Sequence, residues 1–145
     1  MAKAETPVPA KDYLEAARLR EALRAFARRT ELATRAAGLT PRIYQLLLMV
    51  RTARDGDAGA GFTELEQRLQ LGKSTIAELV TRCEERGLVR RELDRDRRRG
   101  IRVRLTAAGT RKLEQAVAGL GDERRHLFDL VDELRRGAAA GARRR

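Results

Sequence analysis

Apolar residues recur along most of this chain at intervals of three and four positions, which is the spacing of one face of an α-helix. One such stripe runs from about residue 12 to residue 37, and Gly38 is a typical stop for it. Thr40 and Pro41 then suit the start of a second helix, whose sequence IYQLLLMV is apolar nearly all round. Because a helix that is apolar on every side is buried, we expect this one at the centre of a domain.

Two short amphipathic helices follow a loop at 54–61 that is rich in Gly and Asp. Thr63 and Glu66 fit a T-x-x-E capping box at the start of the first helix, which would bury Leu65 and Leu69. The residues LGKST interrupt the pattern before the second helix. The inward positions expected in that second helix, at i, i+3, i+4 and i+7, are Ile76, Leu79, Val80 and Cys83.

After Gly87 the period changes to two, which indicates β-strands. Leu88 and Val89 begin one short strand. The second strand alternates apolar residues with arginines, so one face should be buried: Ile101, Val103 and Leu105 inside, with Arg102 and Arg104 outside. The arginine-rich segment 93–103 therefore joins two strands as a hairpin. Thr106 then suits the N-cap of a further helix, and a last amphipathic helix follows Gly121.

Composition narrows the classes of partner. The 145 residues carry a formal net charge of +11, so we expect a polyanion such as DNA, RNA or an anionic membrane surface. Aromatic residues make up only 3% of the chain, which disfavours recognition of single strands by stacking on bases. The single cysteine, Cys83, excludes an intramolecular disulfide and any multi-cysteine metal site.

Several other functions are disfavoured by the absence of their motifs. No nucleophile–base pair, carboxylate pair or cofactor motif competes, so we expect no enzyme, no cofactor and no metal site. The triplet GKS at 72–74 lacks the glycine of a phosphate-binding loop, because that position holds Gln67. No signal core and no apolar run of roughly 18–20 residues is present, so we expect a cytoplasmic protein without a membrane partner.

The outward face of the second short helix carries the residues best suited to contact duplex DNA. A major groove about 12 Å wide accepts one helix, and the N-terminal residues of that helix meet base edges. Lys73 and Arg82 can bind phosphate or guanine, whereas Glu78 either accepts from a cytosine amine or orients Arg82. The alternative is a solvated helix surface. The contacts expected from the two short helices are Thr63, Lys73, Ser74, Thr75, Ala77, Glu78, Thr81 and Arg82.

The order of these elements resembles the multiple-antibiotic-resistance repressor (MarR) family of bacterial transcriptional regulators. The segments GLTPRIYQLLLMV, FTELEQRLQLGKSTIAELVTRCEERGLVRR and RRRGIRVRLTAAG carry the resemblance, which extends over about residues 12–136. It implies a mainly α fold with a small β-hairpin, in which terminal dimerisation helices flank a winged helix-turn-helix. The implied division is a flexible tail at 1–10, dimerisation helices at 11–37 and 106–136, a winged region at 38–105 with its recognition helix at 73–86, and a disordered basic tail at 137–145.

The resemblance also assigns roles within the hairpin, which would be the wing. In this family an arginine near the wing tip enters the minor groove, where a narrow groove concentrates negative potential. Arg99 matches that position, while Arg97 stands where the family usually has Asp. The candidates for insertion are therefore Arg97, Arg98 and Arg99, with Arg95 as a further DNA contact and Asp94 or Asp96 as the brace.

The implied function is transcriptional repression in the bacterial cytoplasm, in association with the nucleoid. A homodimer would bind a pseudo-palindromic operator in double-stranded DNA. A small aromatic or anionic effector is a further implied partner, with Tyr13, Arg18 and Tyr44 as candidate pocket residues. Two alternatives stay open: an architectural, sequence-tolerant DNA-binding protein, and an RNA-binding winged helix.

Overall fold

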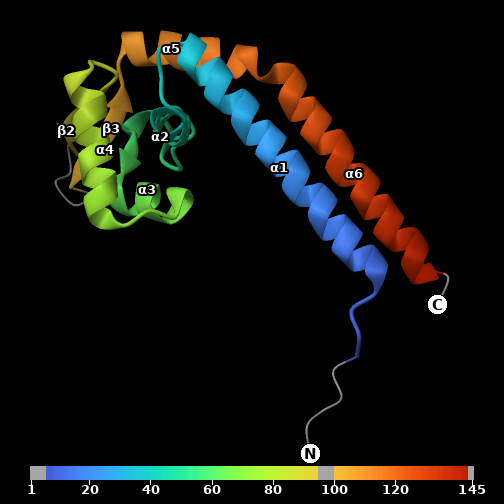
Figure 1. The fold of residues 1–145 in the computed structure, drawn as a ribbon. Helices are drawn as coiled ribbons and strands as arrows, with labels where there is room; N and C mark the ends of the chain where they lie inside the picture. Colours follow the sequence, from blue (N-terminus) through green and yellow to red (C-terminus); the bar gives the residue numbers. More distant parts are fainter. Residues whose placement is uncertain (1–5, 95–99, 144–145) are drawn as a thin grey trace, which may run out of the picture. The chain divides into compact units, whose positions relative to one another are not determined.

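The computed structural model describes residues 6–94 and 100–143, which are mainly helical with one small antiparallel sheet, as predicted (Figure 1). The chain divides into a winged unit, residues 31–119, and a helical unit, made of the residues up to 30 and from 120 onward. The elements in chain order are α1 (Ala10–Ala36), α2 (Pro41–Arg51), the 3-10 helix η1 (Gly56–Ala58), β1 (Ala60–Gly61), α3 (Phe62–Leu69), α4 (Lys73–Glu85), β2 (Val89–Leu93), β3 (Ile101–Leu105), α5 (Ala107–Gly119) and α6 (Gly121–Arg143).

The core of the winged unit forms around α2, as the apolar run predicted. Thr40 is the N-cap of this helix, its hydroxyl accepts from the Ile43 backbone N–H at 3.2 Å, and Pro41 opens the first turn. Leu46 and Leu47 are completely buried. A helix with no exposed apolar stripe has to be surrounded, and α2 accordingly contacts α3, α4, α5 and β3.

The sheet has three strands in the order β1-β3-β2, all antiparallel. The hairpin of β2 and β3 was expected, but β1 was not, because Ala60 and Gly61 lie in a segment that the sequence indicated to be a loop. Ala60 pairs with Val103 and is completely buried. Two small residues carry no β-propensity, so this strand exists because β3 offers it a free edge.

The expected alternation of β3 is wrong at its first two residues. Ile101 is 43% exposed, whereas Arg102 is only 8% exposed. The Arg102 guanidinium turns under the loop before β1, where its Nη2 donates to Asp55 Oδ2 at 2.5 Å and to the Gly59 carbonyl at 2.9 Å. The burial of this arginine is offset by partners on a distant loop that accept from its Nη2, which a two-residue period cannot reveal.

The expected capping box of Thr63 and Glu66 is also wrong. The helix α3 begins one residue earlier, at Phe62, with Gly61 as an N-cap that has no side-chain hydrogen bond. Pairing of Gly61 with Arg102 keeps the chain extended up to that point, and the helix starts immediately afterwards. Thr63 is therefore an exposed residue of the first turn rather than its cap.

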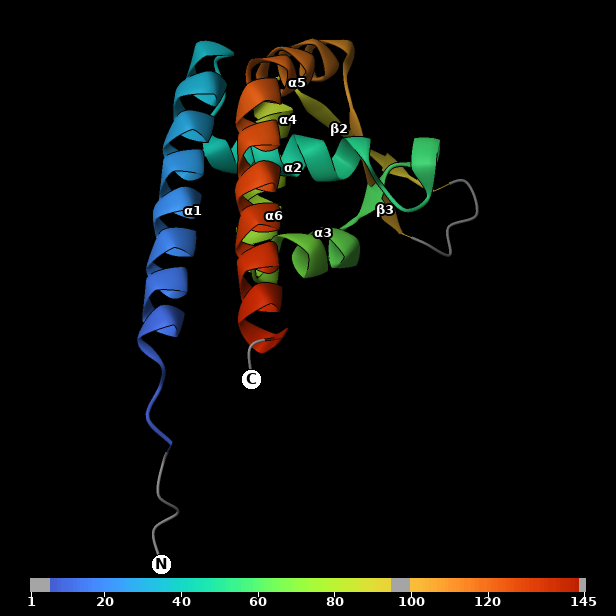
Figure 2. The ribbon, with the colours of Figure 1, turned by 90° about the vertical axis from the view of Figure 1, so that its right-hand side faces the viewer.

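In the helical unit, α1 and α6 run side by side in opposite directions (Figures 1 and 2). Arg29 and Glu123 form an ion pair between them at 3.2 Å. Residues 137–143 belong to α6, so the expectation of a disordered tail is wrong for them; alanines at 138–140 and 142 favour helix strongly. The segment expected at 106–136 as one dimerisation region is divided, because α5 belongs to the winged unit.

Within the part of the chain that the structure describes, no helix is both long and apolar enough to cross a membrane. The same residues contain no group of His, Cys, Asp and Glu that is suited to hold a metal ion.

Candidate nucleic-acid interface

The helix α4 presents its predicted contact residues on one side and its anchoring residues on the other. Ile76, Leu79, Val80 and Cys83 are buried, as the spacing predicted. On the opposite side Lys73, Ser74, Glu78, Thr81 and Arg82 are exposed, with Thr75 and Ala77 half-buried. The N-cap of α4 is Gly72, which makes no side-chain hydrogen bond. Because glycine has no side chain, no bulky group stands in front of the first turn of α4.

Cys83 is an anchoring residue of α4. Burial raises the pKa of its thiol to about 11, although Arg86 lowers that pKa in part. The thiol is therefore protonated at neutral pH, and the thiolate is the form that reacts with oxidants. This supports the interpretation of Cys83 as a core residue rather than a redox sensor.

A network around Arg68 fixes α3 against the end of α2. Arg68 Nη1 donates to the carbonyls of Met49 and Thr52 at 3.0 Å each, and its Nη2 donates to Thr52 Oγ1 at 2.7 Å. Glu64, which is buried, accepts from Arg68 at 3.0 Å and from the Arg54 backbone N–H at 2.9 Å. The hydrogen bonds from Arg68 satisfy carbonyls at the end of α2 that lack partners within the helix. They therefore hold α3, the first helix of the helix-turn-helix, in a fixed orientation.

Arg91, which was not among the predicted site residues, joins the wing strand β2 to both short helices, α3 and α4. Its Nη2 donates to Thr81 Oγ1 at 2.7 Å, and its backbone N–H donates to Glu84 Oε2 at 3.1 Å. Its guanidinium carbon lies 5.7 Å from the centre of the Phe62 ring. The one signal in the sequence was the position of Arg91 in the strand, where it pairs with the apolar Val103 of β3.

The base of the wing is held by short-range contacts on both strands. Asp94 donates its backbone N–H to the Gly100 carbonyl at 3.0 Å, which closes the hairpin. Glu92 accepts from Arg104 at 3.0 Å and pairs with Arg90 at 2.8 Å. The hydrogen bond from Arg104 and the charges of both arginines hold the pKa of Glu92 below its usual range.

Comparisons with known proteins show which proteins this chain is similar to. A family model described as "MarR family" matches residues 37–100, which hold α2, the helix-turn-helix and β2. CouR from Rhodococcus jostii RHA1, solved bound to p-coumaroyl-CoA, is 26% identical, with a TM-score of 0.69 over 86% of this chain and 88% of that chain. The middle of the chain is therefore similar to the MarR family. MarR-family proteins are DNA-binding transcriptional regulators, and this chain shares their winged-helix fold.

Two further MarR-family structures agree in fold. AbsC from Streptomyces coelicolor is 23% identical, with a TM-score of 0.68 over 97% of this chain and 99% of that chain. A MarR variant from E. coli, complexed with operator DNA, is 19% identical, with a TM-score of 0.69 over 93% and 98%. Among curated protein sequences, none matches this chain.

The remaining residues implied by the MarR resemblance are placed as follows. The wing candidates Arg95, Asp96, Arg97, Arg98 and Arg99 lie outside the described residues. Tyr13 and Arg18 are exposed on α1 in the helical unit. Tyr44 is 8% exposed and belongs to the core of the winged unit, so its ring is packed within the protein.

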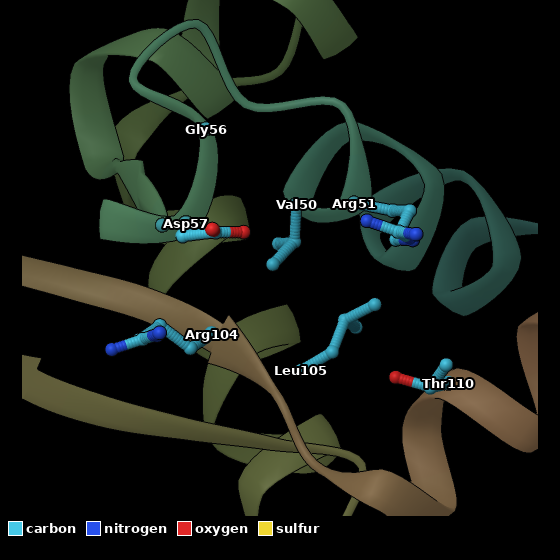
Figure 3. Close-up of a pocket in the computed structure, with 8 residues that line it drawn as sticks. Val50, Arg51, Gly56, Asp57, Arg104, Leu105 and Thr110 are labelled. Carbon is cyan, nitrogen blue, oxygen red and sulfur yellow. The ribbon is translucent and has the colours of Figure 1, made fainter.

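A pocket of about 300 Å³ opens in the winged unit where α2 ends (Figure 3). Val50 and Leu105 extend into the space between α2 and β3, and charged residues surround them. The described residues that line it are Val50, Arg51, Gly56, Asp57, Gly59, Arg104, Leu105 and Thr110. None of the candidate effector residues of the sequence analysis is among them, so the effector pocket stays a prediction.

Proposed function

We propose that this protein is a homodimeric repressor that binds a pseudo-palindromic operator in double-stranded DNA. The recognition helix α4 would lie in the major groove and the wing would lie at the minor groove. The observation that carries the proposal is the two-sided character of α4. One side is fully buried against the winged unit, and the other side exposes hydroxyl and basic residues from its first turn onward.

The N-terminal turn of α4 supplies the side chains that would read bases. Ser74 is exposed and Thr75 is half-buried, and hydroxyls on a first helical turn can donate to or accept from base edges. Lys73 and Arg82 would bind phosphates and Thr63, on the first turn of α3, would contact the backbone. A MarR variant from E. coli with this fold was solved complexed with operator DNA, which supports the proposal of DNA binding.

Sequence selectivity is the decisive test. Binding-site selection with the parent protein should return a palindrome with half-sites about one helical turn apart, roughly 34–36 Å. Replacing Ser74 with Ala should lower selectivity by about tenfold at one or two base pairs in each half-site, because one base contact is lost. Gln115→Ala, on the exposed side of α5, is the matched control and should change nothing. Uniform binding by the parent without a preferred palindrome would favour an architectural protein, and preference for structured RNA would contradict both.

We infer the dimer from the helical unit. Large apolar side chains are exposed along α1 and α6 in a single copy, among them Tyr13 and Phe128, each 65% exposed, together with Leu14, Leu19 and Leu23. Exposure on that scale is typical of a surface that another chain covers. Light scattering at micromolar concentration should give about twice the 16.3 kDa of one chain. Leu23→Glu should shift the mass toward the monomer, whereas Arg24→Glu, on the neighbouring exposed position, should not.

We further propose that a small molecule regulates DNA binding. CouR holds p-coumaroyl-CoA, and this chain exposes Tyr13 and Arg18 on α1, which suit an aromatic or anionic compound. Release of the operator by such an effector would make the protein a ligand-controlled repressor. Its place of action would be the bacterial chromosome, in the cytoplasm.

A further inference from the structure

Arg91 occupies a strand position that ordinarily holds an apolar residue. It pairs with Val103, so the two side chains lie on the same face of the sheet, and Val103 is completely buried. The preceding residue on that face, Val89, is also buried. An arginine in this row needs partners that offset the cost of leaving water. The side chain of Arg91 is 33% exposed, and its partners lie on two different helices, α3 and α4.

The contacts of Arg91 converge on the helix-turn-helix. The guanidinium lies over Phe62, the first residue of α3, at a distance typical of a cation–π contact. Its Nη2 donates to Thr81 and its backbone N–H donates to Glu84, both on α4. The Arg91 Nε also lies 3.9 Å from Glu84 Oε1. One side chain of the wing strand therefore contacts both short helices at once.

Thr81 has its hydrogen-bonding capacity largely used by these contacts. Its hydroxyl donates to the Ala77 carbonyl at 2.9 Å and accepts from Arg91 at 2.7 Å. A hydroxyl has one donor hydrogen, so Thr81 cannot also donate to a base acceptor such as guanine N7. The position of Thr81 on the outward side of α4 predicted it to be a DNA contact. The hydrogen bonds give it a different role.

We propose that Arg91 is a positioning residue for base recognition, and that Thr81 is the point on α4 through which it acts. This rests on the proposed function. With Thr81 and Glu84 held to the wing strand, α4 has a defined orientation relative to the wing. Ser74 and Thr75, two turns earlier on the same helix, then reach the bases in one geometry. Loss of the contact would leave α4 able to lie in the groove but less selective.

The test compares Arg91→Met, Thr81→Val and the double variant in the full chain, with Arg90→Ala as the matched control. Met keeps the aliphatic stem of Arg91, and Val keeps the shape of Thr81 without its hydroxyl. Arg90 is the neighbouring strand arginine and pairs with Glu92 rather than with α4. Affinity is measured for the sequence that the parent selects and for an unrelated duplex, each over a range of salt concentrations.

Each single variant should lower selectivity, the ratio of the two affinities, by about tenfold, since one charge-assisted hydrogen bond is lost. The double variant should lose no more than either single variant, because both remove the same contact. The salt dependence of binding to the unrelated duplex should stay as in the parent. Arg90→Ala should leave selectivity unchanged.

Several outcomes would overturn the inference. Unchanged selectivity in Arg91→Met, or additive losses in the double variant, would remove the link between the two residues. A salt slope lower by about 1 with equal losses for both duplexes would make Arg91 a direct phosphate contact. If Arg91→Met fails to fold, Thr81→Val decides alone: a loss confined to one base pair would make Thr81 a direct reader. If the parent itself selects no sequence, the proposed function fails rather than this inference.

Discussion

Gly109→Ala is expected to destabilise the winged unit by at least about 3 kcal/mol and to lower its melting temperature by about 10 °C or more. A Cβ at this position would lie 2.0 Å from the Leu88 carbonyl oxygen and 2.9 Å from its carbonyl carbon. Those are backbone atoms, so no side-chain rotation can relieve the overlap. Either α5 or the start of β2 would have to move.

The movement would also break a compact set of hydrogen bonds. Thr106 donates its backbone N–H to the Leu88 carbonyl at 3.0 Å, and its hydroxyl donates to the Gly87 carbonyl at 2.6 Å. The Gly109 backbone N–H donates to the Thr106 hydroxyl at 3.0 Å, which caps α5. Gly109, which ends the sequence LTAAG at 105–109, therefore allows α5 to pack closely against the segment that joins α4 to β2.

Thermal unfolding followed by circular dichroism measures this effect, with Gly137→Ala as the matched control. Among the described residues, no atom apart from the adjacent residues and the neighbouring backbone of α6 lies within 4 Å of the position that a Cβ would take at Gly137. The control should therefore stabilise the chain slightly, by about 0.5–1 kcal/mol. Equal melting temperatures for Gly109→Ala and the parent would show that the backbone yields at Leu88 without cost.

The second large effect is expected from the wing. Replacing Arg97, Arg98 and Arg99 together with Ala should weaken binding to all duplex sequences by about 100-fold at ~0.15 M salt, because each released counterion contributes about fivefold there. The slope of log affinity against log salt concentration should become shallower by about 3. Fluorescence anisotropy with operator and unrelated duplexes measures both quantities.

A control variant that loses three positive charges on α1 distinguishes direct contact between the wing and DNA from general attraction of DNA to a positively charged protein. Arg20, Arg24 and Arg28 are exposed on α1, and replacing them with Ala removes the same three charges from the total of +11. This control should reduce affinity much less and keep the salt slope near that of the parent, since long-range attraction is screened beyond roughly 8–10 Å. Equal losses in both triple variants would mean that net charge, rather than the wing, supplies the affinity.

The helices of this protein could be predicted from the sequence because their signals are local. The apolar run of α2, its Thr40 cap and the inward row of α4 each depend on residues within a few turns of one another. The outward residues of α4 followed from the same period, since burying one side of a helix leaves the other side exposed. The family resemblance, which rests on the order of these elements, then assigned the hairpin the role of the wing.

The failures share the opposite property. The strand β1 could not be predicted because two small residues pair only when β3, some forty residues later, lies beside them. Its pairing also moved the start of α3 and made the capping box at Thr63 wrong. Arg102 was expected outside because its burial depends on Asp55 and Gly59 rather than on its neighbours in the strand.

By itself, then, the sequence determined where the helices form, which side of α4 is available and that the field around the chain is positive. Only the tertiary structure decided which polar side chains of α4 are already hydrogen-bonded within the protein and which remain exposed to a ligand. Thr81 and Ser74 look equivalent on a helical wheel, yet Arg91 engages one and Ser74 remains exposed. Hydrogen bonds between distant segments form only after the segments meet, and no local period in the sequence encodes them.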